Sequence, residues 1–176
     1  MPLEKAVLKA VRGGNDIEFM FNPGQISFDD NVNTSESPGA RNKETGKPKV
    51  SYANKKASKI TLTNILFDTY ESKKDVVESY IKKFQEAINF HGDDEKPPTF
   101  KFIWGDRVYL DFCFIEKLNY KLTFFLSDGT PVRAVIDSLN LIEADDPKES
   151  KSIKNPQPTE KQRRTDSVNN RRKKRK

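Results

Sequence analysis

Residues 99–143 constrain the fold more than any other part of this sequence, because they alternate like a series of antiparallel β-strands. Residues 99–104 and 107–117 have the composition of strands, and Gly105 with Asp106 between them forms a two-residue hairpin signal. A hairpin of this kind places its strands side by side in one antiparallel sheet. The sequence therefore predicts a mainly β protein.

The alternation continues through residues 120–126, and a turn at residues 127–130 leads into a last strand at residues 131–143. Adjacent bulky residues such as Phe124 and Phe125 place large apolar groups on both sides of these strands. Two explanations stay open. Either a β-bulge shifts the register, or one side of the sheet forms the core while the other packs on a neighbouring subunit.

The N-terminal half contains further strands and one unusual segment. Residues 5–12 and 17–21 form a predicted hairpin around a Gly-Gly-Asn turn, a short strand follows near residues 26–28, and residues 59–67 form a strand that is apolar on both faces. Residues 31–56 are polar and interrupted by two prolines and two glycines. We therefore expect a long loop here, and a loop of this length inside a compact domain is usually functional or disordered.

Residues 73–90 have the apolar spacing of an amphipathic helix. Ser72 with Asp75 three positions later resembles a capping box, and Gly92 is placed to be the C-terminal cap. These elements predict an α+β, mainly β fold: an antiparallel β-barrel or sandwich of about six or seven strands, with the helix plugging or flanking one side.

Charge divides the chain into two predicted regions. Residues 147–176 contain twelve basic and three acidic residues, whereas residues 1–146 contain 20 basic and 23 acidic ones. Ile153 and Val168 are the only aliphatic residues of the C-terminal region, which also lacks aromatic residues. We therefore expect a folded domain at residues 1–146 and a flexible, disordered basic tail at residues 147–176.

Several classes of protein and of site are excluded on sequence grounds. No stretch approaches the roughly 18 apolar residues of a membrane-spanning helix, and the first residues do not resemble a signal peptide, so we expect synthesis in the cytoplasm. One cysteine, Cys113, and one histidine, His91, cannot build a zinc cluster. The sequence also lacks phosphate-loop and nucleophile-elbow motifs.

The remaining candidates for chemistry have simpler structural explanations. His91 lies at the helix end, Cys113 lies mid-strand between two phenylalanines, and residues 93–95 are acidic but lack the spacing of a calcium loop. We therefore predict no catalytic residue, no cofactor and no metal, and hence a protein that is not an enzyme.

The end of the basic tail is a candidate polyanion contact. Basic clusters suit phosphate-rich partners, although they carry no sequence specificity. Nucleic acid, another acidic partner such as a protein or an envelope polymer, and a merely solvated tail all stay open as explanations. The residues concerned are Arg171, Arg172, Lys173, Lys174, Arg175 and Lys176.

Four motif segments, taken in order, resemble the tube-like domain of contractile injection system proteins, which belong to phage-tail-like particles. They are residues 19–23 (FMFNP), 66–69 (LFDT), 98–105 (PTFKFIWG) and 125–134 (FLSDGTPVRA). The resemblance is to the small baseplate-hub or tube-adaptor proteins, and it spans about residues 5–144. Such relatives often continue into a LysM carbohydrate-binding module, but the thirty residues after Asp146 are too few and too polar for one.

The resemblance implies a tube-like β-barrel that assembles with other copies into a ring, hexameric in this family, next to inner-tube, spike and baseplate proteins. It implies a structural component in the hub or inner-tube region, joining tube to spike and leaving the cell with the particle. The alternative is a nucleic-acid-associated β-barrel module that binds through its tail. The residues to which the resemblance assigns fold or interface roles are Phe21, Asn22, Pro23, Phe67, Asp68, Trp104, Gly105, Gly129, Pro131, Arg133 and Ala134.

Overall fold

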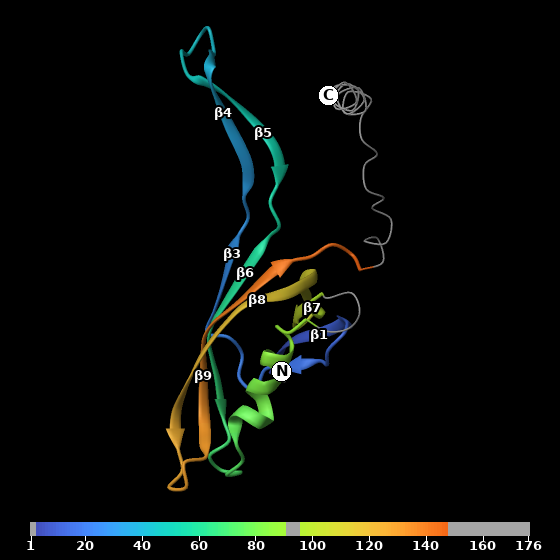
Figure 1. Cartoon of the computed structure of the whole chain (residues 1–176), viewed down its shortest axis with the longest axis vertical. Helices are drawn as coiled ribbons and strands as arrows, with labels where there is room; N and C mark the ends of the chain where they lie inside the picture. Colours follow the sequence, from blue (N-terminus) through green and yellow to red (C-terminus); the bar gives the residue numbers. More distant parts are fainter. Residues whose placement is uncertain (1–2, 91–95, 148–176) are drawn as a thin grey trace, which may run out of the picture. The chain divides into compact units, whose positions relative to one another are not determined.

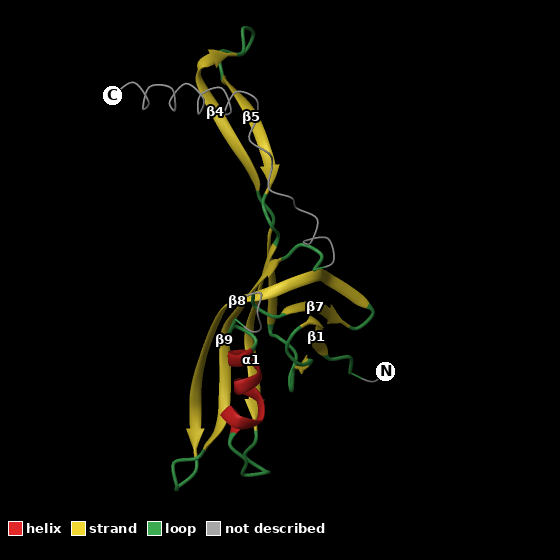
Figure 2. Ribbon diagram, turned by 45° about the vertical axis from the view of Figure 1, so that its right-hand side comes forward, coloured by secondary structure: helices red, strands yellow, loops and turns green. Residues whose placement is uncertain are grey.

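The computed structural model describes residues 3–90 and 96–147, and its main sheet contains seven antiparallel strands (Figure 1). This sheet curls into a half-barrel with one helix packed against it (Figure 2), which confirms the predicted mainly β class. Its strand order is β2-β1-β7-β8-β9-β6-β3, so β2 and β3 lie at its two edges. The strands are β1 (Ala6–Arg12), β2 (Ile17–Glu18), β3 (Gln25–Asp29), β6 (Lys59–Asp68), β7 (Thr99–Trp104), β8 (Arg107–Phe125) and β9 (Pro131–Glu143).

The two longest strands, β8 and β9, pair along most of their length. Their register shifts at four places, one of them between Phe124 and Phe125. The bulge explanation is therefore correct at this pair, and the bulges let strands of unequal length follow the curl of the sheet. Both phenylalanines remain exposed, by 42% and 50% respectively.

The core lies on the helix side of the sheet. Alternate residues of β6 and β9 are buried, with one shift of phase in each strand, after Leu62 and after Ile136. Period-2 patterning of this kind is expected when one face of a strand is covered. Phe84 of the helix contacts Phe19 and Phe67, with ring centroids 5.8 Å apart in both pairs. The helix therefore covers the core, because Phe84 packs against both Phe19, which directly follows β2, and Phe67 of β6.

The helix is shorter than its apolar spacing predicts. A π-helical turn, Val77–Ile81, continues directly into α1, Lys82–Glu86. Lys73 has a φ of +53°, a left-handed conformation that cannot belong to a right-handed helix. Asp75 supplies the cap by accepting the Val77 N–H at 2.7 Å, whereas the Ser72 hydroxyl donates to the Thr69 carbonyl, so the predicted capping box is wrong. Gly92, the predicted C-terminal cap, lies outside the described residues.

The predicted loop at residues 31–56 is in fact a β-hairpin, so this prediction was wrong. Strands β4 (Val32–Arg41) and β5 (Pro48–Lys55) form a separate two-stranded sheet, and a turn at residues 42–47 joins them. Polar pairs hold it across the strands, including the Ser35 and Ser51 hydroxyls at 2.8 Å. Because few of its residues are apolar, the alternation of apolar and polar residues that indicates a strand is weak here. Figure 1 shows the hairpin continuing beyond the ends of β3 and β6.

Candidate assembly interface

Two of the four motif segments meet at the start of β1. The Asn22 side chain accepts the Ala6 N–H through Oδ1 and donates through Nδ2 to the Glu4 carbonyl, both at 2.9 Å. The Trp104 indole N–H donates to the same Glu4 carbonyl at 3.2 Å. Gly105 follows with a φ of +58°, which a residue with a side chain adopts only at a cost. These residues fasten the N-terminal segment to the sheet.

The other two motif segments meet at the far end of β6. Asp68 and Arg133 are directly opposite each other on β6 and β9. The Arg133 Nη2 and Nε atoms donate to one carboxylate oxygen of Asp68 at 2.6 and 2.9 Å. The Arg133 guanidinium lies 5.6 Å from the centroid of the Phe124 ring, and Tyr70 meets this ring edge-on at 5.4 Å. An ion pair and two aromatic rings thus form one network.

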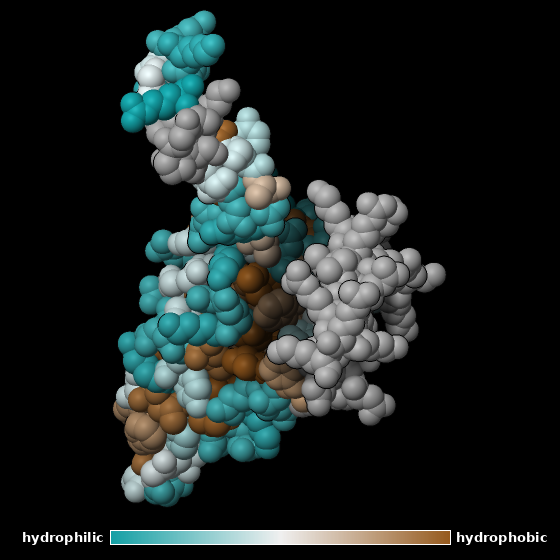
Figure 3. Space-filling view, turned by 45° about the horizontal axis from the view of Figure 1, so that its top comes forward, coloured by the Kyte–Doolittle hydropathy of each residue, from teal (hydrophilic) through white to brown (hydrophobic). Residues whose placement is uncertain are grey.

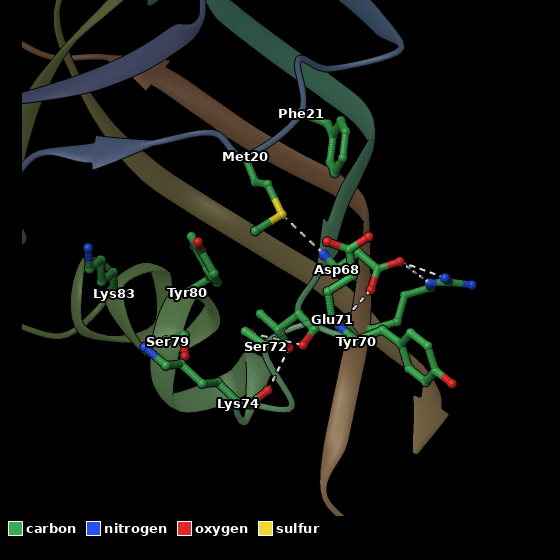
Figure 4. A pocket seen from close by; sticks show the side chains of 12 residues that line it. Met20, Phe21, Asp68, Tyr70, Glu71, Ser72, Lys74, Ser79, Tyr80 and Lys83 are labelled. Atoms are coloured by element: carbon green, nitrogen blue, oxygen red, sulfur yellow. Dashed lines mark hydrogen bonds and ion pairs between the residues drawn. The ribbon is translucent and has the colours of Figure 1, made fainter. Parts of the chain in front are cut away.

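A groove of about 870 Å³ opens beside this network (Figure 4). Met20 and Phe21 line one part of it, and the Met20 sulfur accepts the backbone N–H of Asp68 at 3.2 Å. Tyr80 and Lys83 contribute to it from the helix. The groove therefore combines side chains from the first, second and fourth motif segments with the helix surface.

The electrostatics of Asp68 favour its ionised form. The backbone N–H of Tyr70 donates to Asp68 Oδ1 at 2.9 Å, and this hydrogen bond, together with the Arg133 guanidinium, lowers the pKa of the Asp68 carboxyl. Both charges stay partly solvated, because 24% of the Asp68 side chain and 42% of the Arg133 side chain are exposed. The pair therefore contributes no more than about 1 kcal/mol to the stability of the fold.

The remaining motif residues belong to the core and to turns. Phe67 and Ala134 are fully buried and paired across β6 and β9, and Pro23 is also buried. Gly129 has a φ of +87° in the turn between β8 and β9, where its N–H donates to the Leu126 carbonyl at 3.0 Å. Pro131 begins β9 opposite Phe125.

Four exposed aromatic residues surround the groove and the adjoining strand end, and we call this surface the aromatic end. Their exposed fractions lie between 42% and 52%. Two of them belong to the first and fourth motif segments, and strand register and ring packing bring the other two to the same place. They are Phe21, Tyr70, Phe124 and Phe125.

The hairpin has a second apolar surface that sequence reasoning missed. Tyr52 is opposite Thr34 in the register, and period-2 alternation places Val32 and Val50 on the same side of the ribbon. The other side is polar, with Asn33 bonded to Asn54 at 2.8 Å. Val50 and Tyr52 at alternate positions were the available signal. We call Val32, Val50 and Tyr52 the hairpin surface. In Figure 3, the visible face of the hairpin is largely hydrophilic.

Other candidate residues do not form a site within the described part of the chain. Cys113 is fully buried, and burial raises the pKa of its thiol to about 12, so it is not a nucleophile. Among residues 3–90 and 96–147, no group of three His, Cys, Asp or Glu residues is arranged to hold a metal ion, and no helix could cross a membrane. His91, the acidic residues 93–95 and the tail cluster Arg171–Lys176 lie outside this part.

Comparison with protein families gives a match that covers most of the chain. Residues 3–152 match the family described as contractile injection system tube protein. The matched region contains all four motif segments, the hairpin and the helix. No curated protein matches the sequence.

The chain belongs to the contractile injection system tube protein family.

Members of this tube protein family are structural and non-enzymatic, which confirms the expectation that the chain is not an enzyme. Tube proteins form hexameric rings with other injection-system components. For a ring subunit, the functional surfaces are those that contact other chains. The aromatic end, the hairpin surface and the edge strands β2 and β3 are therefore the candidate interfaces of this tube protein.

Proposed function

We propose that this tube protein works in the baseplate hub or inner-tube region of the particle, where it joins the tube to the spike. The observation that supports this position is the difference between the two ends of β6. A basic, polar hairpin precedes the first residue of β6 in the chain, and an aromatic groove lies beside its last residue. A component that contacts unlike neighbours along an axis needs unlike surfaces at its two ends.

The proposed role is mechanical. When the surrounding sheath contracts, the protein transmits the outward movement of the tube to the spike. Strands β8 and β9, with 19 and 13 residues, are hydrogen-bonded to each other along most of their length. A long pair of strands of this kind suits such a load. No bond in a substrate is made or broken in this role.

Lateral contacts between copies would use the edges of the half-barrel. Strands β2 and β3 are at opposite edges of the sheet, and an edge strand offers backbone N–H and C=O groups for pairing with another chain. Because the two edges differ, contact between them is head-to-tail and closes a ring when the rotation between copies permits it. The motif residues then act as fold and interface residues.

Electron cryomicroscopy of the assembled particle tests the position directly. The protein is expressed together with the tube, spike and baseplate proteins of the same particle, and the density for this chain is located by its long β-hairpin. We expect one ring between the tube and the spike. Density for this chain repeated along the whole tube would contradict the adaptor position but not membership of the tube.

Size analysis tests the more general role. The full-length chain is examined by analytical ultracentrifugation alone and with the partner proteins. Ring-sized assemblies are expected in at least one condition. A protein that stays monomeric in every condition would argue against any structural role in a tube.

A further inference from the structure

The groove at the aromatic end has more basic than acidic side chains in its lining. The basic residues are Lys74, Lys83 and Arg133, and the acidic ones are Asp68 and Glu71. Arg133 and Asp68 are bonded to each other, so the charges left for an occupant are those of the two lysines and Glu71. Within residues 3–90 and 96–147, neither lysine forms an ion pair. The groove therefore has a local excess of positive charge.

The hydrogen-bonding groups of the groove that stay available are mainly cationic donors. The hydroxyls of Ser72 and Ser79 already donate to backbone carbonyls of their own chain, at 3.0 and 2.7 Å. Arg133 uses Nε and Nη2 for one oxygen of Asp68, which leaves its Nη1 atom for another acceptor. Charged N–H donors of this kind form their strongest hydrogen bonds with carboxylates and phosphates.

Apolar side chains border the same groove. Phe21 and Tyr70 are 49% and 52% exposed, and Met20 lies beside Phe21. Figure 4 shows Met20 and Phe21 on one side of the groove and the helix residues Tyr80 and Lys83 on another. An occupant that fits this lining combines negative charge with an apolar or aromatic side chain.

The size of the groove suits a short segment of chain. Its volume of about 870 Å³ lies within the range of clefts that bury a small ligand, about 300–1,000 Å³. A few residues of a peptide fill such a space, whereas a folded domain does not enter it. The hairpin of another copy is a poor match in charge, because residues 31–56 contain six basic and two acidic residues.

A nucleic acid also matches the groove less well than an acidic peptide does. Each strand of a duplex carries a phosphate about every 3.4 Å, so its backbone calls for a row of cations. The groove offers two lysines without ion pairs beside the carboxylate of Glu71. Residues 1–146 contain 20 basic and 23 acidic residues, and this net negative charge repels a polyanion.

We propose that the groove binds a short acidic peptide segment of a neighbouring injection-system component. The proposal rests on the proposed function, because it specifies the chemistry of the neighbour that meets the aromatic end. Carboxylates of the segment accept hydrogen bonds from Lys74 and Lys83, and one of its apolar or aromatic side chains packs against Phe21 and Tyr70.

Binding of a synthetic peptide to the full-length protein tests this site. The probe is a short fluorescein-labelled peptide with glutamates around one phenylalanine, and fluorescence anisotropy measures its dissociation constant. Two comparison peptides replace every glutamate by glutamine, or the phenylalanine by alanine.

Two double variants of the protein have the same net charge. The groove variant combines Lys74→Gln with Lys83→Gln, and the matched control combines Lys73→Gln with Lys82→Gln. All four lysines are exposed, and those of the control do not line the groove. Any binding of the peptide by the basic tail is therefore the same in both variants.

We expect the groove variant to weaken binding of the probe roughly tenfold and the control to weaken it less than about twofold. Only the groove variant loses charge-assisted hydrogen bonds to the peptide. Both comparison peptides should bind the unchanged protein more weakly than the probe does. Equal losses from the two variants, equally tight binding by either comparison peptide, or no binding of the probe would overturn the proposal.

Duplex DNA, measured in the same way, tests nucleic acid as the occupant. DNA binding that is the same in the groove variant and the control supports the peptide site. A loss of DNA binding confined to the groove variant would make the groove a nucleic-acid contact, and the peptide proposal would be wrong.

The position of the chain in the assembled particle separates this proposal from the proposed function. If the chain lies between tube and spike but no acidic segment of a neighbour enters the groove, the site fails and the proposed function stands. If the probe binds as expected but the chain repeats along the whole tube, the proposed function fails and the site stands.

Discussion

Single side chains connect parts of this chain that are distant in the sequence. Asn22 makes two hydrogen bonds to the N-terminal segment, and Trp104 donates a third to the same segment. Asp68 and Arg133 connect β6 to β9 beside the groove. At this scale, the motif residues act through specific hydrogen bonds and ion pairs whose loss can be measured.

Asp68→Asn tests the ion pair. The variant keeps an oxygen that can accept the Tyr70 N–H but loses the charge that faces Arg133. Because both side chains are partly exposed, we expect a loss of about 1 kcal/mol in the free energy of unfolding at pH 7. Urea titration measures this value, and Asp106→Asn, in the exposed turn between β7 and β8, is the control.

The pH dependence of this difference follows from the direction of the pKa shift. The folded-state pKa of Asp68 is lowered, so its contribution is fully present above the unfolded value of about 3.9. The contribution is lost as the pH falls from about 4 through the lower folded-state pKa. The two proteins should thus become equally stable in acid, and a difference that persisted or grew there would contradict this assignment.

At the scale of elements, the helix contributes side chains to the core and the hairpin does not. The helix buries Ile81 and Phe84 in the common core, whereas the described side chains of the hairpin are exposed. The helix should therefore be required for folding, and the hairpin only for contacts with other chains.

Phe84→Ala tests the helix. Removing a fully buried ring that contacts Phe19 and Phe67 should lower the free energy of unfolding by about 3–5 kcal/mol. Chemical denaturation monitored by circular dichroism measures the loss. Lys82→Ala, which removes only an exposed ion pair with Glu78, should change stability by less than about 0.5 kcal/mol. Comparable losses from the two changes would mean that the helix does not seal the core.

Shortening the hairpin tests its independence. Replacing residues 33–54 with a short glycine-containing turn should leave the unfolding midpoint of the body nearly unchanged, because the described side chains removed are exposed. Assembly of the variant, followed by ultracentrifugation, should be strongly reduced. A large fall in the unfolding midpoint would show that the body needs the hairpin for stability.

At the scale of the whole molecule, the family match covers the sheet, the helix and the hairpin, and it ends at residue 152. The residues that follow are strongly basic. They account for most of the difference between the net charge of the whole chain, +6, and the slightly negative net charge of the body, residues 1–146. We propose that these two regions are separable, with assembly residing in the body and polyanion contact in the tail.

A chain ending at Asp146 tests this separation. We expect it to keep the unfolding midpoint and the assembly behaviour of the full-length protein, and to lose any salt-sensitive, sequence-independent binding to duplex DNA. Fluorescence anisotropy at several salt concentrations measures the binding. DNA binding that survives the truncation would place the nucleic-acid contact within residues 1–146 and contradict this separation.

The sequence by itself determined the elements whose signals are local. Alternation and turn residues predicted the strands in residues 99–143, the first hairpin and the presence of one helix, and four short motif segments indicated the family. The helix start was misplaced because the left-handed Lys73 depends on the preceding turn. The hairpin at residues 31–56 was missed because its pairing relies on polar side chains with weak periodicity.

Only the tertiary structure decided which residues form surfaces. Phe21 and Arg133 were named by the family resemblance, but Tyr70 and Phe124 join them through strand register and bulges. The convergence of Asn22 and Trp104 on the Glu4 carbonyl likewise depends on how β1 pairs with β7. Periodicity is a property of neighbouring residues, whereas a surface is built by register between strands, which is set by the packing of the whole sheet.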